Sequence, residues 1–164
     1  MFKLAAVFSL LASSTLAAGL EIQIEGEANG TVKIDLFEDL APKHVEQITA
    51  LAAAGKYDGV VFHRVIDGFM AQMGGSDLAD LPAEFSERPF DRGIVGMARS
   101  QNPNSANSQF FIMFKPGHFL NGQYTVVGQV TEGMDVVDAI KLGTGGNGSV
   151  VGKPDMMSKV TVTE

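Results

Sequence analysis

Short apolar segments separated by turn-forming residues run through most of this chain, and they limit it to folds built from many short strands. Apolar and polar side chains alternate in residues 20–25 and 32–36, which gives each strand one dry face. Asn29-Gly30 lies between these segments and is a hairpin signal. Further short apolar runs occupy 60–66, 69–73, 94–98, 109–114, 125–130 and 158–163. The pattern therefore predicts about eight short strands.

Two other segments have the apolar spacing of helices. Residues 42–52 form one such segment, with Pro42 suited to its first turn and Gly55 to its end. Residues 133–142 form the second. Because two helices cannot cover both faces of an open sheet of about eight strands, we expect one mainly-β domain. Its predicted form is a closed eight-stranded antiparallel β-barrel capped by two α-helices.

The first residues have the layout of a secretory signal peptide. Lys3 is followed by an apolar run and then by small residues that end at Ala17 and Ala18. The run is too short to span a hydrocarbon core of about 30 Å comfortably, which disfavours a membrane anchor. We expect residues 1–17 to be a signal peptide, with cleavage after Ala17 or Ala18, and residues 18–164 to be a domain with no stable membrane association.

Composition excludes several kinds of chemistry. Lys and Arg number 12 and Asp and Glu number 19, for a net charge of −7, so the chain is a poor candidate for binding nucleic acid. The absence of cysteine excludes disulfides and thiolate catalysis. The three histidines, His44, His63 and His118, lack the spacing of metal ligands. We therefore expect neither a metal nor a cofactor.

One glycine-rich motif fails on its context. Residues 143–148 match the dinucleotide-binding pattern G-x-G-x-x-G, but that site needs a strand before the motif and a helix after it. Here the motif follows a predicted helix. We interpret it as a flexible exit from that helix.

Two polar residues interrupt apolar runs and call for an explanation. Arg64 and Gln72 would project beside Phe69 and Met70 if the segments 61–66 and 69–73 pair around a turn at Asp67-Gly68. Buried polar groups need partners. The pair is therefore either a hydrogen bond that fixes a corner of the barrel or part of a functional site.

Sequence blocks along the whole chain resemble the cyclophilin family of peptidyl-prolyl cis-trans isomerases. The resemblance extends from about Leu20 to Val162 and follows the family's order in APKHVE (41–46), FHRVI (62–66), GFMAQ (68–72), SQFFI (108–112), LNGQYTVVG (120–128) and VTEGMDVVDAI (130–140). It implies an eight-stranded barrel capped by two helices. It also implies that the substrate is an extended proline-containing peptide, bound in a groove on the outer face of the barrel.

The resemblance also implies which residues form the site. The family's catalytic arginine falls on Arg64, and the glutamine that positions it falls on Gln72. Substrate-binding positions fall on His63, Phe69, Met70, Ala98, Arg99, Ser100, Gln109, Phe111, Phe119, Leu120 and Tyr124, of which Phe69, Met70, Phe111 and Leu120 correspond to the proline pocket.

Some positions depart from the family's pattern. Phe119 stands where many members have Trp, so we expect cyclosporin to bind weakly. Tyr124 stands where many members have His, and Arg99 where Asn is frequent. Met73 follows Gln72 at a position where a small residue is usual.

The expected function is therefore acceleration of X–Pro isomerisation in unfolded proteins and proline-containing peptides. The alternative is a proline-peptide binding module or holdase chaperone with incidental isomerase activity. Arg64 favours the isomerase, since binding alone needs only the apolar pocket. The signal peptide and the resemblance to bacterial members predict a periplasmic protein, with secretion as the alternative. We expect a monomer.

Overall fold

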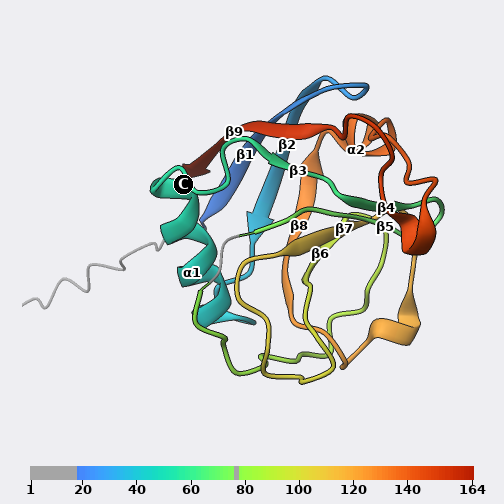
Figure 1. The fold of residues 1–164 in the computed structure, drawn as a ribbon. Coiled ribbons are helices and arrows are strands. Elements are labelled where there is room, and N and C mark those ends of the chain that lie inside the picture. Colours follow the sequence, from blue (N-terminus) through green and yellow to red (C-terminus); the bar gives the residue numbers. More distant parts are fainter. Residues whose placement is uncertain (1–17, 76–77) are drawn as a thin grey trace, which may run out of the picture.

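The strands form one curled antiparallel sheet (Figure 1). The computed structural model of the protein describes residues 18–75 and 78–164, so the expected signal peptide lies outside the described residues. The strands are β1 (Gly19–Glu25), β2 (Gly30–Leu36), β3 (Val60–Val61), β4 (Arg64–Ile66), β5 (Met70–Gln72), β6 (Ile94–Met97), β7 (Phe110–Met113), β8 (Val126–Glu132) and β9 (Met156–Thr163). Their order in the sheet is β3-β9-β1-β2-β8-β6-β7-β5-β4.

The sheet has nine strands rather than the eight expected, because the segment 60–66 is divided into β3 and β4. Phe62 and His63 separate the two strands and bond to a different part of the chain. The Phe62 N–H donates to the Asp155 carbonyl at 2.9 Å, and the Val150 N–H donates to the His63 carbonyl at 3.0 Å. Within the described ranges no ladder joins β3 to β4 directly, so the predicted closure by strand pairing is not seen. The mainly-β antiparallel fold with two helices is confirmed.

The hairpin expected around Asp67-Gly68 is present and sets the geometry of the site. β4 and β5 pair with Arg64 directly opposite Gln72. The Phe69 N–H donates to the Ile66 carbonyl at 3.0 Å and closes the turn. Gly68 has a φ of +68°, a conformation that glycine adopts without steric cost. The local sequence therefore brings the two polar side chains together on one face of the hairpin.

The two helices lie apart from one another along the curled sheet (Figure 1). Helix α1 (Pro42–Ala53) packs against β9, and α2 (Met134–Asp138) packs against β2. Helix α2 is shorter than the predicted 133–142, because the backbone after Ile140 bonds to other segments. The Lys141 N–H donates to the Asp155 carboxylate at 2.9 Å, and the Gly143 N–H donates to the Val65 carbonyl at 2.8 Å. Two 3₁₀ turns, η1 (His118–Leu120) and η2 (Gly146–Gly148), complete the fold.

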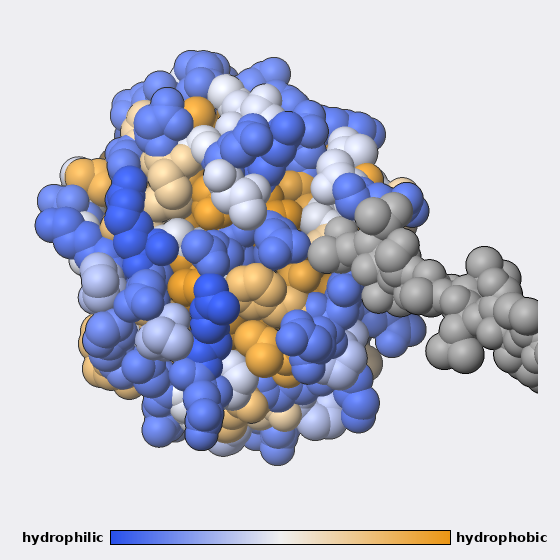
Figure 2. All heavy atoms as spheres, turned by 180° about the vertical axis from the view of Figure 1, so that it is seen from behind, coloured by the Kyte–Doolittle hydropathy of each residue, from blue (hydrophilic) through white to orange (hydrophobic). Residues whose placement is uncertain are grey.

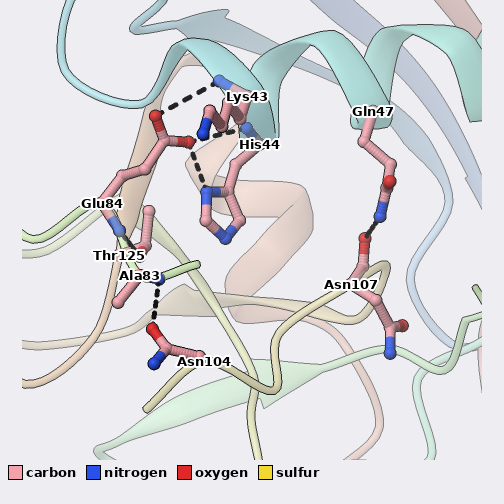
Figure 3. Close-up of polar contacts among 8 residues, drawn as sticks. All are labelled: Lys43, His44, Gln47, Ala83, Glu84, Asn104, Asn107 and Thr125. Carbon is pink, nitrogen blue, oxygen red and sulfur yellow. Dashed lines mark hydrogen bonds and ion pairs between the residues drawn. The ribbon is translucent and has the colours of Figure 1, made fainter. Parts of the chain in front are cut away.

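The N-terminus of α1 is capped by a residue distant in the sequence. Ala41 provides no side-chain cap. Instead, the Glu84 carboxylate accepts hydrogen bonds from the backbone N–H groups of Lys43 at 3.3 Å and His44 at 2.8 Å (Figure 3). It also contacts the buried His44 ring at Nδ1, at 2.5 Å. A carboxylate in this place satisfies free N–H groups and complements the helix dipole.

The same polar layer reaches the loop that precedes β7. The Ala83 N–H donates to Asn104 Oδ1 at 2.9 Å, and Gln47 Nε2 donates to the Asn107 carbonyl at 2.5 Å (Figure 3). The Glu84 N–H donates to Thr125 Oγ1 at 3.0 Å. Helix α1 and the segment around Glu84 therefore hold the 104–107 loop in place.

Candidate active site

A cavity of about 450 Å³ opens at the surface where β4, β5, β7 and η1 meet. We refer to it as the main cavity. Its lining is Arg64, Phe69, Met70, Gln72, Ala98, Arg99, Phe111, Phe119, Leu120, Tyr124 and Asn147. The structure thus brings together residues from five separate parts of the sequence, and all but Asn147 are among the predicted site residues.

The floor of the main cavity is apolar. Met70, Phe111 and Leu120 are buried and come from β5, β7 and η1. The rings of Phe111 and Tyr124 pack edge to face, with centroids 6.0 Å apart. These side chains form a concave surface of a size and chemistry that fit a small apolar ring.

Glycine behind the floor lets the aromatic rings approach the sheet. Gly96 on β6 lies opposite Phe111 on β7. A Cβ placed on Gly96 would lie 2.6 Å from ring atoms of both Phe111 and Phe90, which is too close for van der Waals contact, so the rings would have to move. The depth of the main cavity therefore depends on a missing side chain at this position.

A chain of three hydrogen-bonded polar side chains runs beside the floor, from β4 through β5 to the residue that precedes β7. Arg64 Nη1 donates to Gln72 Oε1 at 3.1 Å, and Gln72 Nε2 donates to Gln109 Oε1 at 3.2 Å. Arg64 and Gln72 belong to β4 and β5, and Gln109 immediately precedes β7. These bonds fix the direction in which the guanidinium points.

Asn147 holds the other side of the guanidinium and was missed by the sequence analysis. Arg64 Nε donates to the Asn147 carbonyl at 2.9 Å, and Arg64 Nη2 donates to Asn147 Oδ1 at 3.1 Å. Asn147 lies in η2, within the motif interpreted as a flexible helix exit, and has a φ of +58°. Asn tolerates this left-handed conformation better than most residues. An Asn in a glycine-rich stretch could have indicated this backbone conformation. It could not have indicated the contact with Arg64, which lies 83 residues away in the sequence.

Arg99 forms the rim between the main cavity and a second one. Its Nε and Nη2 donate to the Gln123 carbonyl at 3.0 and 2.8 Å, and its guanidinium lies over the Tyr124 ring at 4.5 Å. The second cavity, of about 300 Å³, is lined by Gln72, Ala98, Arg99, Ser100, Ser105, Asn107 and Gln109. The predicted residues Ser100 and Gln109 therefore lie beside the main cavity, not in it.

Phe119 is the most exposed large apolar side chain among the described residues, at 73%. Its ring packs against Phe69 with centroids 5.4 Å apart. On the face drawn in Figure 2, apolar side chains gather in hollows between hydrophilic ones. An exposed aromatic ring beside a cavity offers contact area to a ligand.

His63 is the one predicted site residue that lines neither cavity. It is exposed and lies between β3 and β4. Partial desolvation of its ring, together with the charge of neighbouring Arg64, lowers the pKa of His63 below its ordinary value. The imidazole is therefore neutral at neutral pH.

The main cavity offers hydrogen-bond donors and apolar contact. Within residues 18–75 and 78–164, no three His, Asp or Glu side chains gather as metal ligands would. No helix in this part of the chain is long and apolar enough to cross a membrane. The two lining arginines and the amides are suited to binding a neutral or anionic group beside an apolar ring.

The family model for cyclophilin type peptidyl-prolyl cis-trans isomerases matches residues 20–162. The chain belongs to the cyclophilin family. A Brucella suis protein named "Probable peptidyl-prolyl cis-trans isomerase" is 56% identical over 153 residues, which cover 82% of this cyclophilin and 78% of the relative. A peptidyl-prolyl cis-trans isomerase of Streptomyces antibioticus is 42% identical over 130 residues, covering 68% of this chain and 78% of the relative.

Solved structures agree with this assignment. A crystal structure of a Cryptosporidium parvum cyclophilin type isomerase superposes with a TM-score of 0.79 at 25% identity, covering 91% of this chain and 99% of that one. A second structure of the Cryptosporidium protein, determined in the presence of the dipeptide Ala-Pro, gives a TM-score of 0.78 at 26% identity, covering 89% and 99%. The activity of this cyclophilin is peptidyl-prolyl cis-trans isomerisation.

Proposed function

We propose that Arg64 is the catalytic residue of this cyclophilin and that the main cavity holds the proline of its peptide substrates. The observation that carries the proposal is the position of the Arg64 guanidinium, which lines the same cavity as the apolar floor. It is held there by Gln72 on one side and Asn147 on the other.

The reaction itself defines what the site must supply. Rotation about a peptide bond is opposed by amide resonance, with a barrier of about 18–20 kcal/mol. No covalent bond breaks, so the reaction needs no nucleophile and no general base. In the twisted amide, the proline nitrogen regains a lone pair. A fixed hydrogen-bond donor aimed at that nitrogen stabilises the twisted state over the planar one.

Arg64 has the properties of such a donor. An arginine side chain keeps its proton at neutral pH and carries five N–H groups in a rigid plane. Its bonds to Gln72 and Asn147 fix this plane before substrate binds. We assign Gln72 the role of positioning residue for Arg64.

The apolar floor contributes in a different way. Met70, Phe111 and Leu120 would clamp the pyrrolidine ring while the acyl side of the bond swings. A floor that excludes water also weakens amide resonance, because the charge-separated planar amide is better solvated by water. We assign Ala98, Arg99, Ser100 and Gln109 to the part of the groove that holds the rest of the peptide.

We also propose where the enzyme acts and on what. The signal-peptide layout of residues 1–17 supports export, to the periplasm of a bacterium or outside the cell. Its substrates there would be unfolded exported proteins with slow X–Pro bonds. We propose that it acts as a monomer and binds cyclosporin weakly, since Phe119 lacks the N–H donor of an indole.

A test of stoichiometry separates the isomerase from the alternative, a holdase. Exchange between cis and trans forms of an Ala-Pro peptide is followed by NMR at an enzyme-to-peptide ratio of about 1:1000. An isomerase accelerates exchange at this ratio because it turns over. If exchange is unchanged and the protein only suppresses aggregation at equimolar amounts, the isomerase function is refuted and the holdase is favoured.

A further inference from the structure

The main cavity and the second cavity beside it together form a groove, and this groove is positively charged although the chain as a whole is acidic. The net charge is −7. Arg64 and Arg99 both line the main cavity, and Arg99 lines the second cavity as well. No Asp or Glu of the described residues lines either one. The groove therefore differs in sign from the rest of the protein.

The charges of these two arginines are not neutralised by their partners in the described chain. Arg64 donates to the oxygens of Gln72 and Asn147, and Arg99 donates to backbone carbonyls. Arg92 shows the contrast, because it forms an ion pair with Asp138 at 2.7 Å and lies outside both cavities. Neutral partners orient a guanidinium without cancelling its charge.

Arg99 is also held rigidly. Carbonyls of Ser100, Gln101 and Gln123 accept from its nitrogens, and Tyr124 lies against its face. Among the described residues, its Nη2 donates to the Gln123 carbonyl alone, which leaves one N–H of that nitrogen for a ligand. A guanidinium fixed in this way loses little conformational freedom when it binds a carboxylate.

We propose that this cyclophilin prefers peptides with an acidic side chain, Asp or Glu, within two residues of the proline, and that Arg99 selects it. The proposal rests on the proposed use of the main cavity for proline. Because Arg99 lies where the two cavities meet, a carboxylate beside the bound proline can accept from the remaining N–H of Arg99 Nη2. Coulomb attraction at such a partly exposed site corresponds to a preference of about threefold to tenfold.

The test uses a peptide panel and an NMR exchange assay that needs no coupling protease. Glu, Gln or Lys replaces one alanine of an alanine-rich proline peptide, at each of the two positions on either side of the proline. At low salt we expect kcat/KM for Glu to exceed that for Lys about threefold to tenfold at one position or more, with Gln between. The gap should shrink at about 1 M salt.

Matched variants show whether Arg99 is responsible. Arg99→Gln should abolish the gap between the Glu and Lys peptides, and Arg99→Lys should keep part of it. Arg88→Gln changes the net charge equally, but Arg88 contacts Gln129 and Phe37 outside both cavities. It should leave the gap unchanged.

The outcomes separate this inference from the proposed function. Equal kcat/KM for Glu and Lys peptides at every position would overturn the acidic preference while leaving the isomerase intact. A gap that Arg88→Gln removes as fully as Arg99→Gln would also overturn the role of Arg99. Failure to accelerate even the alanine peptide would refute the proposed function instead.

A separate contact lies at the start of β1. The Ala18 N–H donates to Glu38 Oε1 at 2.5 Å, and the Ala18 carbonyl accepts from the Leu36 N–H at 3.0 Å. Gly19 then begins the paired part of β1. Glu38 makes no other hydrogen bond or ion pair within the described residues. Both contacts of Ala18 survive cleavage after Ala17, and both are lost on cleavage after Ala18.

We infer that the mature chain begins at Ala18 and that its new α-ammonium group pairs with Glu38. Hydrolysis of the Ala17–Ala18 amide by water leaves a carboxylate on Ala17 and an ammonium group on Ala18. That ammonium has an ordinary pKa of about 7.7–8.0, so it is charged at neutral pH. The amide contact seen at Glu38 thereby becomes an ion pair when the chain is processed.

The first test is N-terminal sequencing of the full chain exported by a bacterial host. Ala18 as the first residue supports the inference, and Gly19 or Met1 would overturn it. The second test compares processed wild type with Glu38→Gln, using Glu46→Gln on the exposed side of α1 as the matched loss of charge.

The ion pair predicts a definite pH dependence. It raises the pKa of the folded α-amino group, so the stabilisation is complete below the ordinary pKa and is lost as pH rises through the raised one. At pH 6 we expect Glu38→Gln to lower Tm by about 1–3 °C. At about pH 10 we expect the substitution to leave Tm unchanged. An equal effect of Glu38→Gln at both pH values, or one no larger than that of Glu46→Gln, would overturn the ion pair.

Discussion

Replacing Glu84 by Gln removes the charge that caps helix α1 while leaving the shape of the side chain almost unchanged. The carboxylate accepts from the N–H groups of Lys43 and His44 and contacts His44 Nδ1 at 2.5 Å. Gln supplies only one acceptor oxygen, and its NH₂ group would face donors. The substitution therefore tests the hydrogen bonds and the charge with little change in packing.

The expected loss of stability follows from these contacts. A hydrogen bond to a charged group contributes about 1.5–3 kcal/mol, and a helix cap about 0.5–2 kcal/mol. Because the bonds share one carboxylate, they do not simply add. We expect Glu84→Gln to lower the free energy of unfolding by about 2–4 kcal/mol at pH 7, which is about 5–12 °C in Tm.

The pH dependence gives an independent check. Burial alone would raise the pKa of Glu84, but hydrogen bonds from His44 and Lys43 lower it overall. The stabilisation is then complete above the unfolded-state pKa of about 4.3 and is lost as pH falls through the lower folded-state pKa. The difference in Tm between wild type and Glu84→Gln should therefore shrink below about pH 4.5.

Thermal denaturation followed by circular dichroism measures both effects. Glu46→Gln on the same helix is the control, since Glu46 is exposed. Activity of Glu84→Gln should fall by less than about threefold, because Glu84 lies outside both cavities. A Tm within 1–2 °C of wild type would refute the assigned cap, and so would a difference that does not change with pH.

Other predictions concern the groove. Phe119→Trp should tighten cyclosporin inhibition about ten- to a hundredfold with little change in kcat/KM, because the indole adds a donor and contact area; equal inhibition of both proteins would contradict this. Gly96→Ala should destabilise the fold by about 1–3 kcal/mol and raise KM, since the new methyl displaces Phe111, as denaturant titration and kinetics would show. Asn147→Ala should lower kcat more than it raises KM, because Arg64 loses its hydrogen bond to the Asn147 side chain and keeps only the one to the backbone carbonyl; an unchanged kcat would contradict that positioning role.

Local sequence was sufficient to predict much of the fold. The alternation in β1 and β2, the turn at Asp67-Gly68 and the apolar stripe of α1 each depend on residues close together in the chain. The hairpin also explains why Arg64 and Gln72 could be paired in advance, since their register follows from the turn. The predicted length of helix α2 also came from the local pattern, but contacts with residues distant in the sequence overrode that pattern. Helix α2 ends early because distant groups capture the N–H groups that follow it.

Site residues could be predicted from the sequence only where they lie within a recognisable motif. Arg64 and the apolar floor lie in blocks that resemble the family, whereas Asn147 lies in a glycine-rich stretch with no apolar pattern. Its contact with Arg64 and the cap from Glu84 to α1 join segments far apart in the sequence. A single sequence contains no signal for such pairings, because the fold brings these residues together only after the sheet has curled.

The central claim, that Arg64 stabilises the twisted amide rather than binding the peptide, is tested most directly by Arg64→Ala. Exchange NMR on an Ala-Pro peptide gives the catalytic rate and the affinity in one experiment. We predict a rate loss of about 100- to 1000-fold with a Kd within about threefold of wild type, and incomplete rescue by Arg64→Lys, which lacks the planar fork. A variant that keeps more than about half of the wild-type rate, or that loses affinity in proportion to rate, would contradict the account.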